Sequence, residues 1–332
     1  MTAAASRSQA PDDPLHAPLL AGDRRALARA ITLVESTRED HRLRADALLS
    51  ALLPKTGRST RLGITGIPGV GKSTFIERFG LTLIGQGHRV AVLAIDPSSK
   101  RTGGSILGDK TRMELLSRDP AAFIRPSPAG TTLGGVARRT REAMLLVEAA
   151  GYDVVIVETV GVGQSETAVA DMVDMFVLLL PPAGGDDLQG IKKGVVELAD
   201  LLVVNKADGE FKAAAHRAAA DYANALRLLH PSTARWTPEV RTCSAVEGGG
   251  VAEVWETAGR FRAAIGEAGI AKRRAAQARA WLWNEVGETL MSALRGHADV
   301  KRQVAQLERE VERGALAPSA AARRLLDAFL GR

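Results

Sequence analysis

Cysteine is almost absent from this chain, and the scarce residue types exclude several classes of protein. The single cysteine, Cys243, rules out a disulfide within the chain and fits a reducing compartment, so we expect a cytoplasmic protein. The six histidines are scattered, which counts against a metal centre of clustered Cys and His ligands. No apolar run reaches the ~18 residues of a membrane-spanning helix. The segment 1–13 also lacks the apolar stretch of a signal peptide, so we expect no membrane association and a disordered first dozen residues.

A strong charge of one sign is also lacking. The net charge is +6 over 332 residues, and the basic residues near the carboxyl end alternate with acidic ones, as on a solvated helix face. No nucleic-acid recognition motif accompanies them, so we expect no nucleic-acid partner. The length exceeds that of one ordinary domain, and a hydrophobic content of 45% is enough for a large buried core.

A glycine-rich loop, GIPGVGKST over residues 66–74, carries the clearest functional signal. It follows the apolar run 62–65 and precedes a predicted helix over 75–86, which is the setting of a phosphate-binding P-loop and disfavours a mere strand-to-helix turn. In such a loop the backbone N–H groups surround phosphate oxygens, and the following helix directs its positive dipole end at them. Lys72 would reach the β- and γ-phosphates, and the Ser73 hydroxyl would bind Mg²⁺. The predicted nucleotide-binding residues are Gly66, Gly69, Val70, Gly71, Lys72, Ser73 and Thr74.

A second motif, NKAD over residues 205–208, indicates which base is bound. It follows the apolar run 201–204 and therefore lies at the carboxyl end of a predicted strand. The Asp208 carboxylate can accept hydrogen bonds from both N1–H and the 2-amino group of guanine, and adenine offers neither donor. The stem of Lys206 would lie along the base, and Asn205 would tie this loop to the P-loop. The motif therefore predicts GTP and GDP as the bound nucleotides.

A weaker element, TCSA over residues 242–245, supports the guanine prediction. It follows an extended segment around 240–241, and it contains the two further candidates Ser244 and Ala245. The Ala245 N–H could donate a hydrogen bond to guanine O6. This element is not specific by itself.

A Mg²⁺ site is predicted from carboxylates at or after strand ends. The apolar run 152–157 leads into Glu158, where most G proteins have an Asp that approaches Mg²⁺ through water. Asp96 directly follows the apolar run 91–95, and Asp109 lies in a polar, glycine-rich segment that could act as a switch. Oxygen ligands suit Mg²⁺. The predicted metal ligands are Ser73, Asp96, Asp109 and Glu158, and Glu158 is also a catalytic candidate together with Lys72.

Gly161 stands where the G-protein pattern has a glycine whose N–H contacts the γ-phosphate. The glutamine that usually follows this glycine and orients the attacking water is absent. Gln164 comes three residues later, and the sequence leaves its role open.

Together these motifs resemble the cobalamin-enzyme accessory GTPases of the MeaB/ArgK/MMAA type, within a wider class that includes nickel-insertion GTPases. The resemblance spans roughly residues 20 to 330. The segments that carry it are 66–73 (GIPGVGKS), 96–99 (DPSS), 103–110 (GGSILGDK), 125–127 (RPS), 134–137 (GGVA), 158–166 (ETVGVGQSE) and 205–208 (NKAD).

The resemblance implies a metallochaperone-class G protein that gates adenosylcobalamin delivery to methylmalonyl-CoA mutase and protects or reactivates that enzyme. The mutase would hold most of the cobalamin and would accelerate a slow intrinsic hydrolysis of GTP. A third switch segment over 181–193 would supply Lys192, or else Lys193, as a cation that neutralises transition-state charge. The alternative is a solvent-exposed basic turn at the start of a helix. The resemblance also implies a homodimer.

Periodicity divides the chain into three parts. We expect a disordered start and a helical extension over 1–57, a P-loop domain with a doubly wound, mostly parallel α/β sheet over 58–268, and a helical dimerisation arm over 269–332. Two apolar stripes of helical spacing mark the arm, and we expect it to form the homodimer. The stripes are Trp283, Val286, Leu290 and Leu294, then Val300, Val304, Leu307 and Val311.

Two rival functions remain open at this point. An arginine-type small-molecule kinase would need an acceptor pocket and a catalytic base, and a nickel-insertion GTPase would need clustered Cys and His. The sequence presents neither set of residues.

Overall fold

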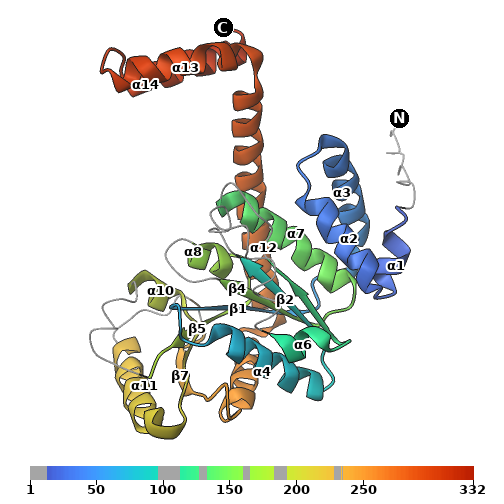
Figure 1. Cartoon of the computed structure of the whole chain (residues 1–332), viewed down its shortest axis with the longest axis vertical. Coiled ribbons are helices and arrows are strands. Elements are labelled where there is room, and N and C mark those ends of the chain that lie inside the picture. Colours follow the sequence, from blue (N-terminus) through green and yellow to red (C-terminus); the bar gives the residue numbers. More distant parts are fainter. Residues whose placement is uncertain are drawn as a thin grey trace. The chain divides into compact units, whose positions relative to one another are not determined.

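The computed structural model describes residues 13–95, 113–126, 133–159, 165–182, 193–227, 233 and 235–332. The predicted disorder of the first dozen residues lies outside this described part. Seven described strands form one sheet in the order β3-β2-β4-β1-β5-β6-β7, and every neighbouring pair is parallel (Figure 1). The strands are β1 (Thr60–Gly66), β2 (Val90–Ile95), β3 (Ala122–Arg125), β4 (Val154–Thr159), β5 (Met175–Leu180), β6 (Leu201–Val204) and β7 (Glu239–Thr242).

Helices cover both faces of this sheet, which is why its central strands are nearly continuous apolar runs such as MFVLLL in β5. Helices α4 and α6 and the first part of α12 share a buried core with one face, and α7 and α8 lie on the opposite side (Figure 1). The chain moves from β1 outward to β2 and β3, then returns through β4 to β5, β6 and β7. The predicted doubly wound α/β fold is therefore confirmed. The helices of this region are α4 (Lys72–Gly85), α6 (Glu114–Arg118), α7 (Leu133–Ala149), α8 (Ser165–Ala170), α10 (Lys193–Leu198), α11 (Lys212–Leu226) and α12 (Val251–Gly296), with the 3-10 turn η2 (Gly209–Phe211).

An amino-terminal group of helices packs against α7. Of these, α2 (Arg24–Glu35) and α3 (Glu39–Leu52) correspond to the helical pair that the apolar spacing over residues 23–53 predicts, whereas α1 (His16–Leu20) is additional. Helix α2 begins after Asp23, whose side chain accepts hydrogen bonds from the N–H groups of Arg25 at 2.7 Å and Ala26 at 2.8 Å. The 3-10 turn η1 (Leu53–Lys55) closes this group just before β1.

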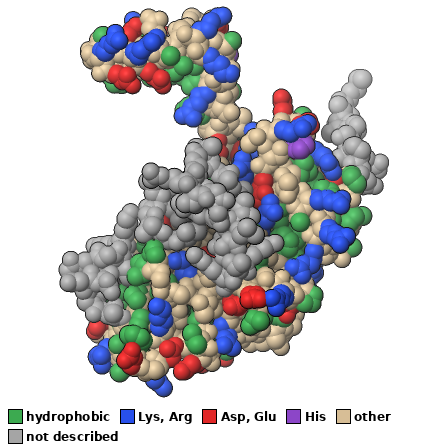
Figure 2. All heavy atoms as spheres, viewed as in Figure 1, with side chains coloured by type: hydrophobic (Ala, Val, Ile, Leu, Met, Phe, Trp, Pro, Cys, Tyr) green, Lys and Arg blue, Asp and Glu red, His purple; other side chains and the backbone are tan. Residues whose placement is uncertain are grey.

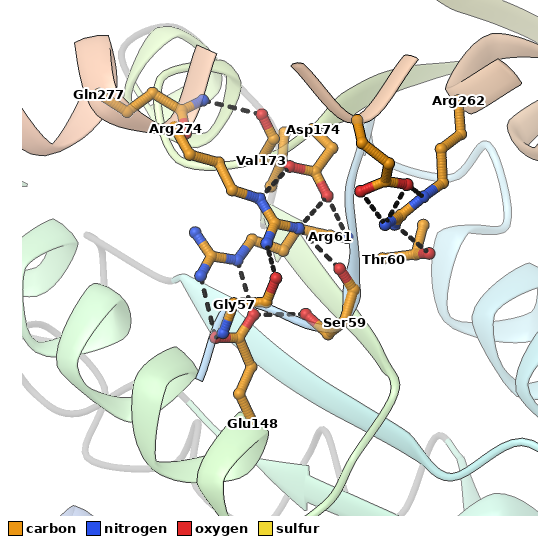
Figure 3. Close-up of polar contacts among 11 residues, drawn as sticks. Gly57, Ser59, Thr60, Arg61, Glu148, Val173, Asp174, Arg262, Arg274 and Gln277 are labelled. Carbon is orange, nitrogen blue, oxygen red and sulfur yellow. Dashed lines mark hydrogen bonds and ion pairs between the residues drawn. The ribbon is translucent and has the colours of Figure 1, made fainter. Parts of the chain in front are cut away.

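A buried ion pair lies at the amino end of β1, opposite the end that carries the P-loop (Figure 3). Arg61 Nε and Nη2 donate to the two carboxylate oxygens of Glu148 on α7 at 2.8 and 2.9 Å. The Ser59 hydroxyl and the Gly57 N–H donate to the same carboxylate. Burial alone would raise the pKa of the Glu148 carboxyl, but these donors outweigh it and hold that pKa below its usual value.

The first part of α12 is attached to the same end of the sheet (Figure 3). Arg274 Nε and Nη2 donate to the Asp174 carboxylate at 2.7 and 2.6 Å, and Nη2 also donates to the Ser59 carbonyl at 2.6 Å. Gln277 Nε2 donates to the Val173 carbonyl at 2.8 Å. These contacts link α12 to the turn between α8 and β5, where sequence patterns predict no contact.

The chain divides into two compact units, one that ends at Gln277 and one that spans Ala278–Arg332. In the second unit, α13 (Ala298–Glu312) and α14 (Pro318–Leu330) pack together, and Val300 and Leu307 are buried. The second predicted stripe therefore packs largely within the chain. The first stripe, on α12, remains open, because Trp283 and Leu290 keep 68% and 56% of their surface exposed.

The charged side chains on α13 and α14 are of both signs in the face drawn in Figure 2. Exposed ion pairs such as Arg302 with Asp299 are part of this pattern. Among the described helices, none combines the length and the apolar character needed to cross a membrane.

Candidate nucleotide site

The glycine-rich loop connects the carboxyl end of β1 to the first turn of α4, at the edge of the sheet where parallel α/β folds bind ligands. Gly71 has a φ of +92°, a left-handed conformation that favours glycine. A Cβ atom at Gly71 would lie 2.8 Å from Asn205 Nδ2, and one at Gly66 would lie 2.5 Å from the Leu179 carbonyl oxygen. The two glycines are thus required by close approach of neighbouring segments as well as by the turn.

Lys72 lies across this loop. Its Nζ donates hydrogen bonds to the carbonyl oxygens of Gly66 at 2.7 Å and Ile67 at 3.2 Å, and the residue is only 8% exposed. The ammonium group is therefore held against the first residues of the loop, next to the backbone that would surround a bound phosphate. This position suits the predicted role of Lys72 toward the β- and γ-phosphates.

Asn205 joins the two predicted nucleotide-binding loops. Its Nδ2 donates to the Val70 carbonyl at 2.9 Å, and its Oδ1 accepts from the Ala245 N–H at 3.2 Å and from the Cys243 thiol at 3.4 Å. Lys206 follows with a φ of +60°, which is uncommon for a residue with a side chain and is typical of functional loops.

The Asp208 carboxylate is positioned by the third predicted element. The Ser244 hydroxyl donates to Asp208 Oδ2, and the Glu247 N–H donates to the Ser244 oxygen at 3.0 Å. The Ala207 N–H donates to the Cys243 carbonyl at 2.9 Å, so the two loops run together. The predicted base-reading residues Asn205, Lys206, Asp208, Ser244 and Ala245 thus lie at one place.

The Ala245 N–H has a partner that the sequence does not reveal. Because it donates to Asn205 Oδ1, it would have to share or exchange this bond in order to reach guanine O6. A long bond of 3.2 Å is compatible with such sharing.

Two of the four predicted Mg²⁺ ligands, Ser73 and Glu158, lie within the described residues. The Ser73 hydroxyl lies 3.5 Å from Glu158 Oε1, and Glu158 is 6% exposed at the end of β4. Beside it, the hydroxyls of Thr65 and Thr159 bond at 2.7 Å and join the ends of β1 and β4. Two hard oxygen donors next to the P-loop fit Mg²⁺, which binds few protein ligands and keeps several waters.

Other predicted site residues lie outside the described residues. They are Asp96, Asp109, Gly161, Gln164 and Lys192, whereas Lys193 is the first residue of α10. In the part of the chain that the structure describes, no three His, Cys, Asp or Glu residues form a metal-binding group.

Two residues near the predicted base-reading loops are not among the predicted site residues. Cys243 is buried, and burial together with the negative charges of Asp208 and Glu253 raises the pKa of its thiol to about 12. The thiol therefore stays protonated at neutral pH, as in a structural cysteine. Arg78 of α4 donates to the carbonyl oxygens of Ala245 and Val246, a contact between residues far apart in the sequence that no local pattern reveals.

A groove of about 500 Å³ runs beside these loops, between α11 and the start of α12. Lys212 and His216 line one part of it, and Glu247 and Glu253 line another. Among the described residues, its lining includes none of the P-loop.

Comparisons with known proteins agree with this geometry. The family model described as "Methylmalonyl Co-A mutase-associated GTPase MeaB" matches residues 27–299. GTPase ArgK of Escherichia coli (strain K12) is 50% identical over 307 residues, which cover 92% of this chain and 93% of that protein. The mitochondrial methylmalonic aciduria type A homolog of Mus musculus is 50% identical over 331 residues, which cover 96% of this chain and 80% of that protein.

A solved structure is also similar over nearly the full length. The crystal structure of a protein named LAO/AO transport system kinase superposes with a TM-score of 0.75 at 42% sequence identity. The match covers 96% of this chain and 97% of that chain. The fold is therefore shared with an experimentally determined relative.

Proposed function

The chain belongs to the family of methylmalonyl-CoA mutase-associated GTPases, and on that premise we propose that it gates adenosylcobalamin delivery to methylmalonyl-CoA mutase and protects or reactivates that enzyme. The chain is a GTPase. What carries the proposal is the family match over residues 27–299, together with the joined phosphate and base loops described above. We propose that the mutase, rather than this chain, holds most of the cobalamin.

In the proposed mechanism, Lys72 binds the β- and γ-phosphates, and Ser73, Glu158, Asp96 and Asp109 would hold Mg²⁺. The metal would neutralise phosphate charge during transfer to water. Because the glutamine that usually orients this water is missing, hydrolysis by the isolated chain should be slow. Binding of the mutase would then bring Lys192, or Lys193, to the transferring phosphoryl group.

The homodimer is also proposed to form through the carboxyl-terminal arm. The support is the exposed apolar stripe on α12, where Trp283 and Leu290 keep more than half of their surface open to solvent. The proposed parts of the chain are the helical extension over 1–57, the GTPase domain over 58–268 and the arm over 269–332.

The test of the proposed function is the rate of GTP hydrolysis with and without methylmalonyl-CoA mutase in one buffer. We expect stimulation of at least about tenfold, which corresponds to about 1.4 kcal/mol of activation free energy. An unrelated acyl-CoA enzyme without cobalamin is the control. Absence of both stimulation and complex formation would reject the mutase as the partner and leave the GTPase without an assigned client.

The same assay examines the switch lysine. We expect Lys192→Ala to leave intrinsic hydrolysis nearly unchanged and to reduce the stimulated rate at least about tenfold, because the cation acts only in the partner-bound transition state. Lys301→Ala, on the exposed surface of α13, is the matched control. Equal losses of the intrinsic and stimulated rates would exclude this role for Lys192.

The kinase alternative, which the sequence analysis raises and the name of the solved relative repeats, is decided by the fate of the γ-phosphate. A GTPase releases inorganic phosphate at the same rate with or without added arginine. Formation of phosphoarginine in step with nucleotide consumption would support the kinase alternative.

Base selection gives a further prediction. We expect Asp208→Asn to weaken GDP binding about a hundredfold, because one of two carboxylate acceptors becomes an amide donor that opposes the N1–H and 2-amino donors. Xanthosine diphosphate should gain affinity, since its C2 carbonyl accepts from this amide. Competition binding of GDP and xanthosine diphosphate measures this change of base preference. Asp221→Asn, at an exposed position of α11, is the control. A parallel loss of both nucleotides would argue against base reading by Asp208.

A further inference from the structure

Arg78 connects the helix that begins at the phosphate site to the loop that reads the base. Its Nη2 donates to the Val246 carbonyl at 2.7 Å, and its Nε donates more weakly to the Ala245 carbonyl at 3.3 Å. Arg78 lies on α4 roughly 9 Å along the helix axis from Lys72, at about 1.5 Å per residue. One rigid helix therefore contacts both ends of the proposed nucleotide site.

The loop that receives these bonds is otherwise closed on itself. The Ser244 N–H donates to the Gly249 carbonyl, and the Gly248 N–H donates to the Ser244 carbonyl, both at 2.8 Å. Among the described residues, the hydrogen bonds that reach the Ala245 and Val246 peptide groups come from Arg78 or go to Asn205. Removal of the guanidinium would leave both carbonyls of this segment to water.

Because a peptide bond is planar, the contact of Arg78 with the Ala245 carbonyl also fixes the direction of the Val246 N–H. In a trans peptide the carbonyl and the next N–H point in opposite directions. Because Arg78 holds the Ala245 carbonyl toward α4, the Val246 N–H points away from α4. In the described part of the chain this N–H has no acceptor, and the neighbouring Ala245 N–H is bonded to Asn205.

We infer that Arg78 is a positioning residue for guanine recognition. It orients the peptide bond between Ala245 and Val246 so that the Val246 N–H donates to guanine O6. Arg78 does not touch the nucleotide in this scheme and acts through the peptide. The inference rests on the proposed reading of guanine by this site. It also explains why an arginine on α4 is directed at two backbone carbonyls rather than at a carboxylate.

Three nucleotides, GDP and two analogues, distinguish the reading of guanine O6 from the reading of the 2-amino group. 6-Thioguanosine diphosphate replaces O6 by sulfur, a weak acceptor, whereas inosine diphosphate keeps O6 and lacks only the 2-amino group that Asp208 would read. Dissociation constants for GDP and these two analogues are measured on the wild type, Arg78→Met, Arg78→Lys and Arg38→Met. Arg38 is an exposed arginine paired with Asp40 in the amino-terminal helices and serves as the control.

Arg78→Met is expected to weaken GDP about tenfold and to bring the ratio of the 6-thioguanosine to GDP dissociation constants close to one. The ratio of the inosine to GDP constants should not change, because Asp208 is untouched. Arg78→Lys should lie between wild type and Arg78→Met, since an ammonium group can donate to one carbonyl at a time. Arg38→Met should match the wild type.

Two outcomes would overturn the role of Arg78 and leave the proposed guanine recognition in place. If Arg78→Met weakens all three nucleotides equally, Arg78 is merely structural, and if it weakens none, the contact has no role in binding. A wild type that binds GDP and both analogues equally would instead refute guanine reading itself, and the inference with it. Thermal unfolding of each variant shows whether the fold is kept.

Discussion

Replacing Lys72 with alanine is expected to weaken GTP and GDP binding by at least about a hundredfold, which corresponds to roughly 3 kcal/mol. The ammonium group is held inside the P-loop by the carbonyls of Gly66 and Ile67, so the phosphates meet a positive charge that is already in position. Alanine removes this charge without opposing the first turn of α4, because it is the best helix former. Equilibrium binding of a fluorescent GDP analogue measures the loss.

Lys301→Ala provides the control for the loss of one positive charge at an exposed position of the second unit. The thermal unfolding temperature of Lys72→Ala without nucleotide should stay close to that of the wild type. Added GDP should raise this temperature for the wild type and not for the variant, because only a ligand that binds the folded state stabilises it. Undiminished GDP affinity in Lys72→Ala would show that the glycine-rich loop is not the phosphate site.

The second large effect concerns stability. Glu148→Gln is expected to lower the free energy of unfolding by about 3–5 kcal/mol, because it leaves the Arg61 guanidinium buried without its counter-charge. The melting temperature should fall by on the order of 10 °C. Glu114→Gln is the matched control, since its ion pair with Arg118 is exposed and should contribute less than about 1 kcal/mol. Equal melting temperatures for the two variants would refute this role of the buried pair.

The same pair predicts a pH dependence. The pKa of Glu148 is lowered in the folded protein relative to its ordinary value of 4.5, so its contribution to stability is present above that value. The contribution is lost as the pH falls through the lower, folded pKa. The difference in stability between wild type and Glu148→Gln should therefore shrink on acidification. Burial raises the pKa of Asp200, but this carboxyl is present in both proteins and cancels in the comparison.

These two predictions concern opposite ends of the sheet. Lys72 follows the carboxyl end of β1, where the loops are open to a ligand, and Arg61 lies near the amino end of the same strand, where the polar groups are mutually satisfied. The buried ion pair therefore anchors β1 to α7 at the end of the strand that is opposite the P-loop. Loss of nucleotide binding in Lys72→Ala and loss of stability in Glu148→Gln should be separable for this reason.

The sequence by itself determined the fold class, the P-loop, the base-reading motif and most strands. Each of these features depends on a short segment of the sequence. The local signals are an apolar run of strand length, glycines where the backbone turns, and a helix that starts directly after them. The sequence predicts that Asn205 ties its loop to the P-loop, and its Nδ2 donates to the Val70 carbonyl of that loop. The short strand β3 and helix α1 lack such a pattern and were not predicted.

The tertiary structure alone decided the contacts between distant segments. Arg78 meets Ala245, Arg61 meets Glu148, and Arg274 meets Asp174 because strand order and helix packing bring these residues together. It also decided that Val300 and Leu307 are buried in the unit where α13 packs against α14, while the stripe that includes Trp283 stays exposed. The physical reason is that hydrophobic periodicity and glycine conformation act over a few residues, whereas partner choice among charged or apolar side chains depends on which surfaces the complete fold places side by side.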